Sequence, residues 1–325
     1  QLRYKVNESP AIDVIWSADQ IEGSKRDYIE YRPNASMPDD KFYNLYDVMK
    51  NYVGKDNTDN DYSFPVKNVT VPVDVAAAIK NGTVNATDSV LSSLDFSLPR
   101  NALMKNELAV LNIIAANNWK RPIYFTNAGA ELGFDQYLRR DGLSYRLAPV
   151  KNSKVNTNWM LDKLTNKFAF GNADKPGVYF DEENRRHLGG IRAAYAELAI
   201  DLAGKNRKEE AKAVLNKVDK MMHESNFGYG LTSRGNLHNR NSLLFLEACY
   251  LAGDQALIKK VSAAIKKDLQ QQVNFYNSLS GMKAENMGQE KQTAEYYLQT
   301  LGQMQTMYNP SVEIPGKVMS KDTSR

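Results

Sequence analysis

The fold of the N-terminal half is decided by one stretch, Asn117-Asn118-Trp119-Lys120-Arg121-Pro122-Ile123-Tyr124-Phe125-Thr126. Residues 107–116 before it carry apolar side chains at helical spacing, and asparagine tolerates the left-handed backbone that ends a helix. Pro122 favours an extended Arg121, and Ile-Tyr-Phe-Thr has the composition of a strand. We therefore predict a helix over 101–116, a cap at the two asparagines and a strand over 121–126. The aromatic side chains of the stretch are expected in the core: Trp119, Tyr124 and Phe125.

Composition sets limits on the class of protein. The chain has 325 residues, of which 42% are hydrophobic and 25% charged, as in a globular protein with a substantial core. Its 42 basic and 38 acidic residues give a net charge of +4, which is too balanced for a nucleic-acid-binding face, so we expect no nucleic-acid partner. The longest apolar runs reach only about half of the ~20 residues that a membrane-spanning helix needs. The first residues lack the apolar segment of a signal peptide, and we expect the chain to be a piece of a longer one.

Short strand and helix patterns alternate through the first half of the chain. Strand composition occurs over 14–16, 28–31, 68–74, 95–99 and 142–149, and helical spacing over 42–52, 75–80, 136–140 and 156–170. Such alternation is typical of a mixed α/β layer. A turn-rich connector over 171–177 follows, so we predict a mixed α/β domain over 1–175.

The second half has helical patterns throughout. Asp181 and the two glutamates after it form a helix start, and that helix is expected to run to Gly204 with a partner over 208–222. Small and apolar residues recur as in tetratricopeptide hairpins, namely at Ala199, Ala211, Leu215 and Val218. A second hairpin over 242–252 and 254–279 and a fifth helix over 289–308 complete the pattern. We predict an α+β chain with an all-α, tetratricopeptide-like domain over 176–310 and a disordered tail over 311–325.

The motifs of common active sites are missing from the sequence. His187, His223 and His238 are far apart and have no metal-ligand spacing, and the single cysteine, Cys249, lies on an apolar helical face. Neither a nucleophile elbow nor a phosphate-binding or dinucleotide-binding glycine loop occurs. We therefore expect no catalytic residue, no metal and no cofactor in this chain.

Two polar clusters are the candidate binding sites. One surrounds the predicted short helix at 136–140, and the other lies between 230 and 242. The candidate residues are Arg139, Arg140 and Asp141 in the first and Arg234, Asn236, His238 and Arg240 in the second. Planar guanidinium groups suit a sugar or carboxylate ligand. Alternatively, Asn239 or Asn241 caps the following helix and the second cluster is structural.

The chain resembles the soluble C-terminal part of the Bacteroidetes DUF2723 membrane proteins, which are related to protein O-mannosyltransferase-like glycosyltransferases of the GT-C type. The clearest matches are Asn-Asn-Trp-Lys-Arg-Pro-Ile-Tyr-Phe-Thr over 117–126 and Asn-Leu-His-Asn-Arg over 236–240. Further stretches follow the same order over 1–10, 23–28, 71–74, 79–84 and 135–147. The resemblance therefore covers nearly the whole chain.

The resemblance implies a larger protein. Members carry an N-terminal multi-span membrane domain that holds the acidic catalytic residue and the lipid-linked sugar site, so no catalytic residue can be transferred to this chain. The soluble part is expected on the extracytoplasmic, periplasmic face of the inner membrane. The α/β layer here is expected to lack its first βα unit. The implied partners are the protein's own membrane domain, an acceptor protein or peptide, and a glycan.

Three hypotheses follow. In the first, the chain is the extracytoplasmic accessory domain of a membrane glycosyltransferase and binds or positions the acceptor protein. In the second, it is a free-standing protein-binding or glycan-binding helical-repeat module without a catalytic role. In the third, it is a soluble enzyme in its own right.

Overall fold

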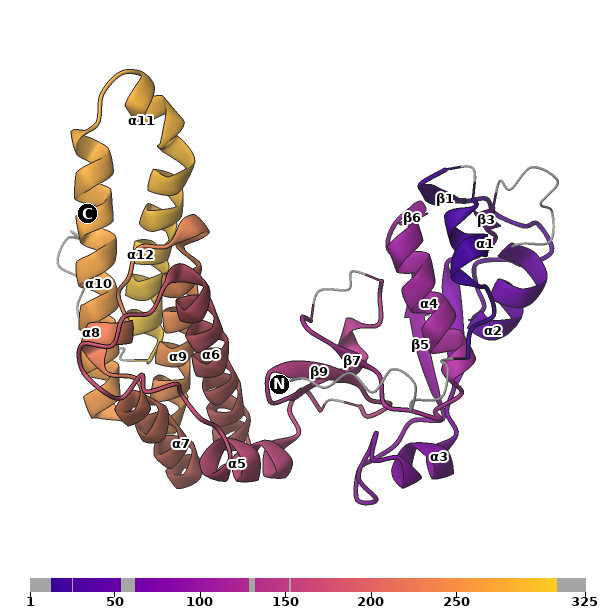
Figure 1. The fold of residues 1–325 in the computed structure, drawn as a ribbon, viewed down its shortest axis with the longest axis horizontal. Coiled ribbons are helices and arrows are strands. Elements are labelled where there is room, and N and C mark those ends of the chain that lie inside the picture. Colours follow the sequence, from indigo (N-terminus) through magenta and orange to yellow (C-terminus); the bar gives the residue numbers. More distant parts are fainter. Residues whose placement is uncertain (1–12, 25, 54–61, 129–131, 152, 309–325) are drawn as a thin grey trace, which may run out of the picture. The chain divides into compact units, whose positions relative to one another are not determined.

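A computed structural model describes residues 13–24, 26–53, 62–128, 132–151 and 153–308. The chain forms two compact units, Gln1–Asn156 and Thr157–Arg325, which Figure 1 colours from indigo to magenta and from magenta to yellow. The described part of the first contains all the strands and the second only helices. The predicted α+β class, a mixed α/β half followed by a helical half, is therefore confirmed.

The described residues of unit 1 form three small three-stranded sheets. In the first, β1 (Tyr28–Tyr31) lies between β3 (Ser63–Phe64) and β6 (Ala102–Met104). In the second, β4 (Asn68–Pro72) pairs in parallel with β2 (Tyr43–Asn44) and antiparallel with β5 (Ser93–Ser97). In the third, β9 (Ser144–Leu147) lies between β7 (Tyr124–Phe125) and β8 (Leu138–Asp141).

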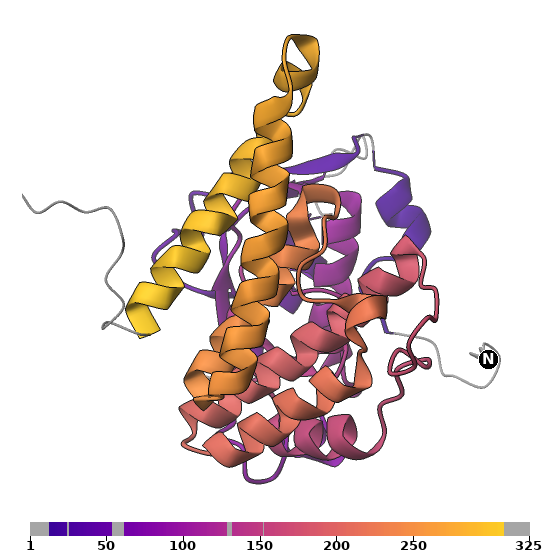
Figure 2. The same ribbon diagram turned by 90° about the vertical axis from the view of Figure 1, so that its left-hand side faces the viewer.

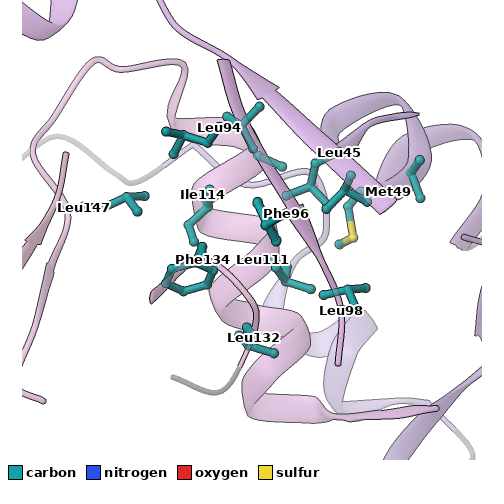
Figure 3. Packing of buried hydrophobic residues seen from close by; sticks show 14 of the residues in the cluster. Leu45, Met49, Leu94, Phe96, Leu98, Leu111, Ile114, Leu132, Phe134 and Leu147 are labelled. Carbon is teal, nitrogen blue, oxygen red and sulfur yellow. The ribbon is translucent and has the colours of Figure 1, made fainter. Parts of the chain in front are cut away.

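Some of the helices of unit 1 pack on these sheets and others on one another. They are α1 (Ala18–Glu22), α2 (Leu45–Val48) continued by the π-helical turn η1 (Met49–Val53), α3 (Val75–Lys80), α4 (Lys105–Asn117) and the 3₁₀ turn η2 (Asp135–Tyr137). Figure 3 shows the main core, where Leu111 and Ile114 of α4 pack near Phe96 of β5. Alternate residues of β5 are buried, as expected for a strand with one face on the core.

Residues 117–126 fold as a helix end followed by a short strand. Helix α4 ends at Asn117, and Asn118 takes the predicted left-handed conformation with φ of 43°. Trp119 is also left-handed (φ 56°) and buried, and its indole Nε1 donates to the Pro72 carbonyl over 2.7 Å. Three details of the prediction were wrong. Residues 102–104 pair with β1 as a strand, so the helix starts late, and the strand predicted over 121–126 is limited to Tyr124–Phe125. Tyr124 is 48% exposed instead of lying in the core.

Some of the other predictions for unit 1 are confirmed and others are wrong. The strand over 28–31 and the helix over 75–80 are confirmed, and the strand predicted over 68–74 forms but ends at Pro72. Residues 14–16 form no strand, and 42–52 contain β2, α2 and η1 in place of one helix. The predicted helix over 136–140 is mostly strand β8, because a turn at Gly142 (φ 62°) lets it pair with β9.

Unit 2 is built from helical hairpins. Its long helices are α5 (Thr157–Asn166), α6 (Glu182–Gly204), α7 (Lys208–Met221), α9 (Leu237–Ala252), α10 (Gln255–Ser278) and α12 (Gly288–Tyr308). Shorter turns are α8 (Glu224–Phe227), η3 (Arg234–Asn236) and α11 (Met282–Asn286). Helices α10 and α12 run side by side (Figure 2). Asp181 accepts from the Asn184 amide and caps α6 as predicted.

The hairpin pattern read from the sequence matches the packing. The four small and apolar positions at 199, 211, 215 and 218 are all buried, and α6 packs on α7. Cys249 is a buried free thiol, as predicted. Helix α9 begins at Leu237, five residues before the predicted start at 242.

The division between the units differs from the predicted boundary near 175. Helix α5 packs on α6 and α7 and so belongs to unit 2, which begins at Thr157. The tail over 311–325 lies outside the described residues. Within the described ranges, no helix is both long and apolar enough to span a bilayer.

Candidate functional site

The first polar cluster is inside unit 1. Arg139, Arg140 and Asp141 lie consecutively on β8, and all three are buried. One edge of β8 pairs with β9. The other edge is covered by residues 154–156, because the Arg140 amide donates to the Lys154 carbonyl over 2.8 Å and the Asn156 amide donates to the Arg140 carbonyl over 3.0 Å. A strand covered on both edges buries side chains that the sequence pattern had placed on a helix surface.

The buried cations of this cluster bind the chain's own groups. Arg139 forms an ion pair with Asp88 (Nη1–Oδ2 2.8 Å) and donates to the Thr83 carbonyl over 3.3 Å. Burial disfavours the Asp88 carboxylate, but the Asn85 amide and the Arg139 guanidinium outweigh it and hold the pKa of Asp88 below its usual value. Asp88 comes 51 residues before its partner.

A second ion pair completes the cluster. Asp141 lies 2.5 Å from Arg146 of β9 (Oδ2–Nη2), and Arg146 also donates to the Gly82 carbonyl and stacks on the Tyr124 ring at 5.0 Å. Arg140 donates to the Gly142 carbonyl over 2.7 Å and lies 4.7 Å from the Tyr145 ring. The three arginines thus fix the loop over 82–88 and the β8–β9 turn. Among the described residues these guanidinium groups contact the chain's own carboxylates, carbonyls and rings, while the Nε atoms of Arg139 and Arg146 are buried without a hydrogen-bond partner.

The second polar cluster is divided between the surface and the interior of unit 2. Arg234 and Arg240 are exposed, whereas Asn236 and His238 are buried. The Ser233 hydroxyl accepts from the His238 amide over 2.9 Å at the start of α9. The capping hypothesis is therefore wrong, because Asn239 and Asn241 both lie inside α9, and the Asn239 side chain points into an interior network.

A network of amides and one carboxylate holds the start of α9 to α10. Asn236 (φ 54°) and Gln272 exchange two hydrogen bonds of 2.9 and 3.1 Å. Asn239 donates to Asn236 Oδ1 over 2.9 Å and to Asp268 Oδ2 over 2.7 Å. Gln272 also donates to Asp268 over 2.6 Å. The network fixes the loop that carries Arg234.

His238 lies next to this network, in a cluster of aromatic side chains around the buried Arg192. Arg192 lies 4.3 Å from the rings of both Phe227 and Tyr229, and donates to the Phe227 and Gly228 carbonyls over 2.6 and 3.0 Å. Burial lowers the pKa of Arg192 to about 10. Burial and the Arg192 charge lower the pKa of His238 to about 4. His238 is therefore neutral near pH 7, with Nε2–H donating to the Gly228 carbonyl over 2.9 Å.

A cavity of about 520 Å³ in unit 1 is a site that the sequence analysis missed. It lies beside Asn44 and Pro72, the last residues of the parallel strands β2 and β4. Its walls combine polar, aromatic and small apolar side chains, namely Asp13, Val14, Asn44, Tyr46, Val71, Pro72, Ala115, Ala116, Asn118 and Lys120. The sequence patterns place these residues in separate predicted elements and do not show that they meet in one cavity.

Metal-binding groups do not gather in the part of the chain that the structure describes. No three His, Cys, Asp or Glu side chains there lie close enough together to hold an ion. His187 is exposed on α6, and the His223 ring instead caps α8 through the Ser225 amide.

Comparison with known proteins places the chain in a family. The model of the TMEM260-associated domain 2 matches residues 1–165 of the 325, and the chain therefore belongs to that family. The matched region contains unit 1 and most of α5, and it stops before α6. Neither a curated protein nor a solved structure shows a significant match.

Proposed function

We propose that the chain is the accessory part of a membrane-bound protein O-glycosyltransferase and that it positions the acceptor polypeptide. The observation that carries the proposal is membership of the TMEM260-associated domain 2 family, which links unit 1 to a membrane protein. The resemblance of the wider chain to DUF2723 glycosyltransferases supplies the reaction class. In this proposal unit 1 adjoins the protein's own membrane domain, on the extracytoplasmic face of the membrane.

Unit 2 supplies the contact with the acceptor. Arg234 lies on the exposed loop before α9, and Arg240 lies in the first turns of that helix. The network of Asn236, Asn239 and Gln272 fixes the backbone between them. A rigid loop with exposed guanidinium groups suits carboxylate side chains of a polypeptide, since little side-chain or backbone freedom is lost on binding.

The test uses the full-length protein in cells. We expect the double variant Arg234→Ala/Arg240→Ala to lower the glycosylation of acceptor proteins, measured by glycoproteomics, without changing the amount of protein in the membrane. The matched control is Lys259→Ala/Lys283→Ala, which removes two exposed cations from α10 and α11. Equal glycosylation in the arginine variant and the wild type would contradict the acceptor role. His238→Ala is unsuitable for this test, because His238 is buried.

A free-standing binding module remains the alternative. The two functions are separated by deletion of the gene region that encodes the chain. Loss of glycosylation on many acceptors fits the accessory role. Unchanged glycosylation together with loss of a bound protein or glycan fits the free-standing module.

A further inference from the structure

We infer that the cavity of unit 1 binds a neutral saccharide unit. The inference does not depend on the acceptor role of unit 2, because it concerns a separate site and a direct binding measurement. It starts from the position of the cavity, beside the carboxyl ends of the parallel strands β2 and β4. In open α/β sheets the crevice outside the carboxyl ends of strands is the usual ligand site. A volume of about 520 Å³ falls in the range of small-molecule sites.

The backbone of one wall is fixed by long-range hydrogen bonds. Asn118 and Trp119 are consecutive left-handed residues, which is an uncommon conformation for a large aromatic residue. The Trp119 indole donates to the Pro72 carbonyl over 2.7 Å, and the Asn81 side chain donates to the Trp119 carbonyl over 2.5 Å. These hydrogen bonds hold the wall in place before a ligand binds, so little conformational entropy of the protein is lost on binding.

The polar groups of the cavity both donate and accept hydrogen bonds. Lys120 and Asp13 form an ion pair at the rim, and the Lys120 ammonium holds the pKa of Asp13 below its usual value. The Asn44 Oδ1 accepts from the Tyr46 amide over 2.9 Å, which leaves its Nδ2 to donate. Asn118 adds a second amide. The ion pair is neutral overall, and the mixed donors and acceptors of the site suit hydroxyl groups.

The remaining walls suit the apolar face of a sugar ring. Val71, Ala115 and Ala116 are small apolar residues, and Tyr46 adds an aromatic ring that is 40% exposed. An aromatic ring offers a flat apolar surface to C–H groups together with a polar hydroxyl at its edge. A purely apolar ligand would leave the amides and the carboxylate unpaired, at a cost in affinity. A neutral ring with hydroxyl edges and an apolar face satisfies both kinds of wall.

The test is ligand-observed NMR on the full chain with a panel of methyl glycosides of neutral hexoses. We expect saturation transfer to at least one glycoside, and about a tenfold weaker affinity in Tyr46→Ala, since an aromatic contact contributes about 1.5 kcal/mol. Asn118→Gly keeps the left-handed backbone and removes one amide, so it is expected to weaken binding as well. The matched control is Tyr179→Ala, which removes an 82% exposed tyrosine of unit 2 and is expected to leave the affinity unchanged.

Three results would overturn the inference. One is the absence of transfer to every glycoside. Another is binding that Tyr46→Ala and Asn118→Gly leave unchanged while both variants fold, as shown by amide hydrogen exchange. The third is stronger binding of inorganic phosphate than of any glycoside, which would identify Lys120 as an anion site instead.

Discussion

The two units bury polar side chains by different means. Unit 1 pairs opposite charges, with Arg139 against Asp88 and Arg146 against Asp141. Unit 2 surrounds Arg192 with two carbonyls and two aromatic rings, and no carboxylate of the described chain lies within ion-pair distance of it. The polar cluster that the sequence indicates in unit 1 is buried, whereas the one in unit 2 has Arg234 and Arg240 at the surface and Asn236 and His238 in the interior.

The difference follows from where the partners lie in the chain. In unit 1, short strands leave long loops, and one of them brings a carboxylate from 51 residues away. In unit 2, the consecutive helices α9 and α10 pack against each other, which brings their amide side chains together. Asn239 thereby contacts Asp268, which lies 29 residues further along the chain. Removing one member of an ion pair leaves a buried charge, whereas removing one amide leaves only an unpaired dipole. The comparison therefore predicts larger losses of stability in unit 1.

The largest effect is expected for Asp88→Asn. The change leaves the buried Arg139 guanidinium without its counter-charge and is expected to lower the free energy of unfolding of unit 1 by about 3–5 kcal/mol. Hydrogen exchange read by mass spectrometry measures the loss separately in each unit. The matched control is Asp162→Asn, since Asp162 pairs with Lys163 on the surface of α5. Its effect should stay within about 0.5 kcal/mol. Equal losses in the two variants would remove the distinction between a buried and an exposed pair.

The second effect is a pH dependence in unit 2. His238 has a pKa of about 4 when folded, against an ordinary value near 6.5. Between these values the unfolded chain binds a proton that the folded chain does not, so the free energy of unfolding decreases as the pH falls. The loss amounts to about 3 kcal/mol by pH 4. His238→Gln is expected to remove this part of the acid sensitivity while still offering a donor to the Gly228 carbonyl.

The measurement is a series of unfolding experiments on unit 2 from pH 7.0 down to about pH 4, in the wild type and in His238→Gln. Carboxylates that titrate in the same range affect both proteins equally. The difference between the two curves therefore reports His238. Parallel curves would show that His238 is protonated in the folded protein despite its position beside Arg192.

The third effect tests the amide network. Asn236→Gly keeps the left-handed backbone at φ of 54° but removes the side chain that exchanges hydrogen bonds with Gln272. Unpaired buried amides cost about 1–3 kcal/mol, so we expect a loss of about 2 kcal/mol in unit 2. Amide hydrogen exchange is expected to become faster mainly in η3, at the start of α9 and in the part of α10 that faces it. A loss as large as that of Asp88→Asn would contradict the contrast between the units.

The sequence predicts local features better than partners. The helix before Asn118 and its left-handed end follow from residue spacing and type, and the structure confirms both. The local pattern predicts the cluster over 139–141 around a short helix at 136–140, because pairing of β8 with β9 depends on contacts across the sheet that no local pattern shows. For the same reason no local pattern indicates that Asp88 and Asp268 are the partners of Arg139 and Asn239, or that Tyr46 and Asn118 line one cavity.

The smallest effect is expected at Asn118, which shares its residue type and left-handed backbone with Asn236. Asn118 is exposed, and its side chain forms no structural network among the residues that the structure describes. Glycine adopts this conformation without steric cost, so Asn118→Gly is expected to change the free energy of unfolding of unit 1 by no more than about 0.5 kcal/mol. Asn118→Ala keeps a Cβ in the left-handed region and should lose about 1 kcal/mol, as measured by hydrogen exchange. A loss near 2 kcal/mol in Asn118→Gly would mean that the asparagine side chain, as in unit 2, holds the fold. The small predicted loss instead leaves that side chain available for a ligand in the cavity.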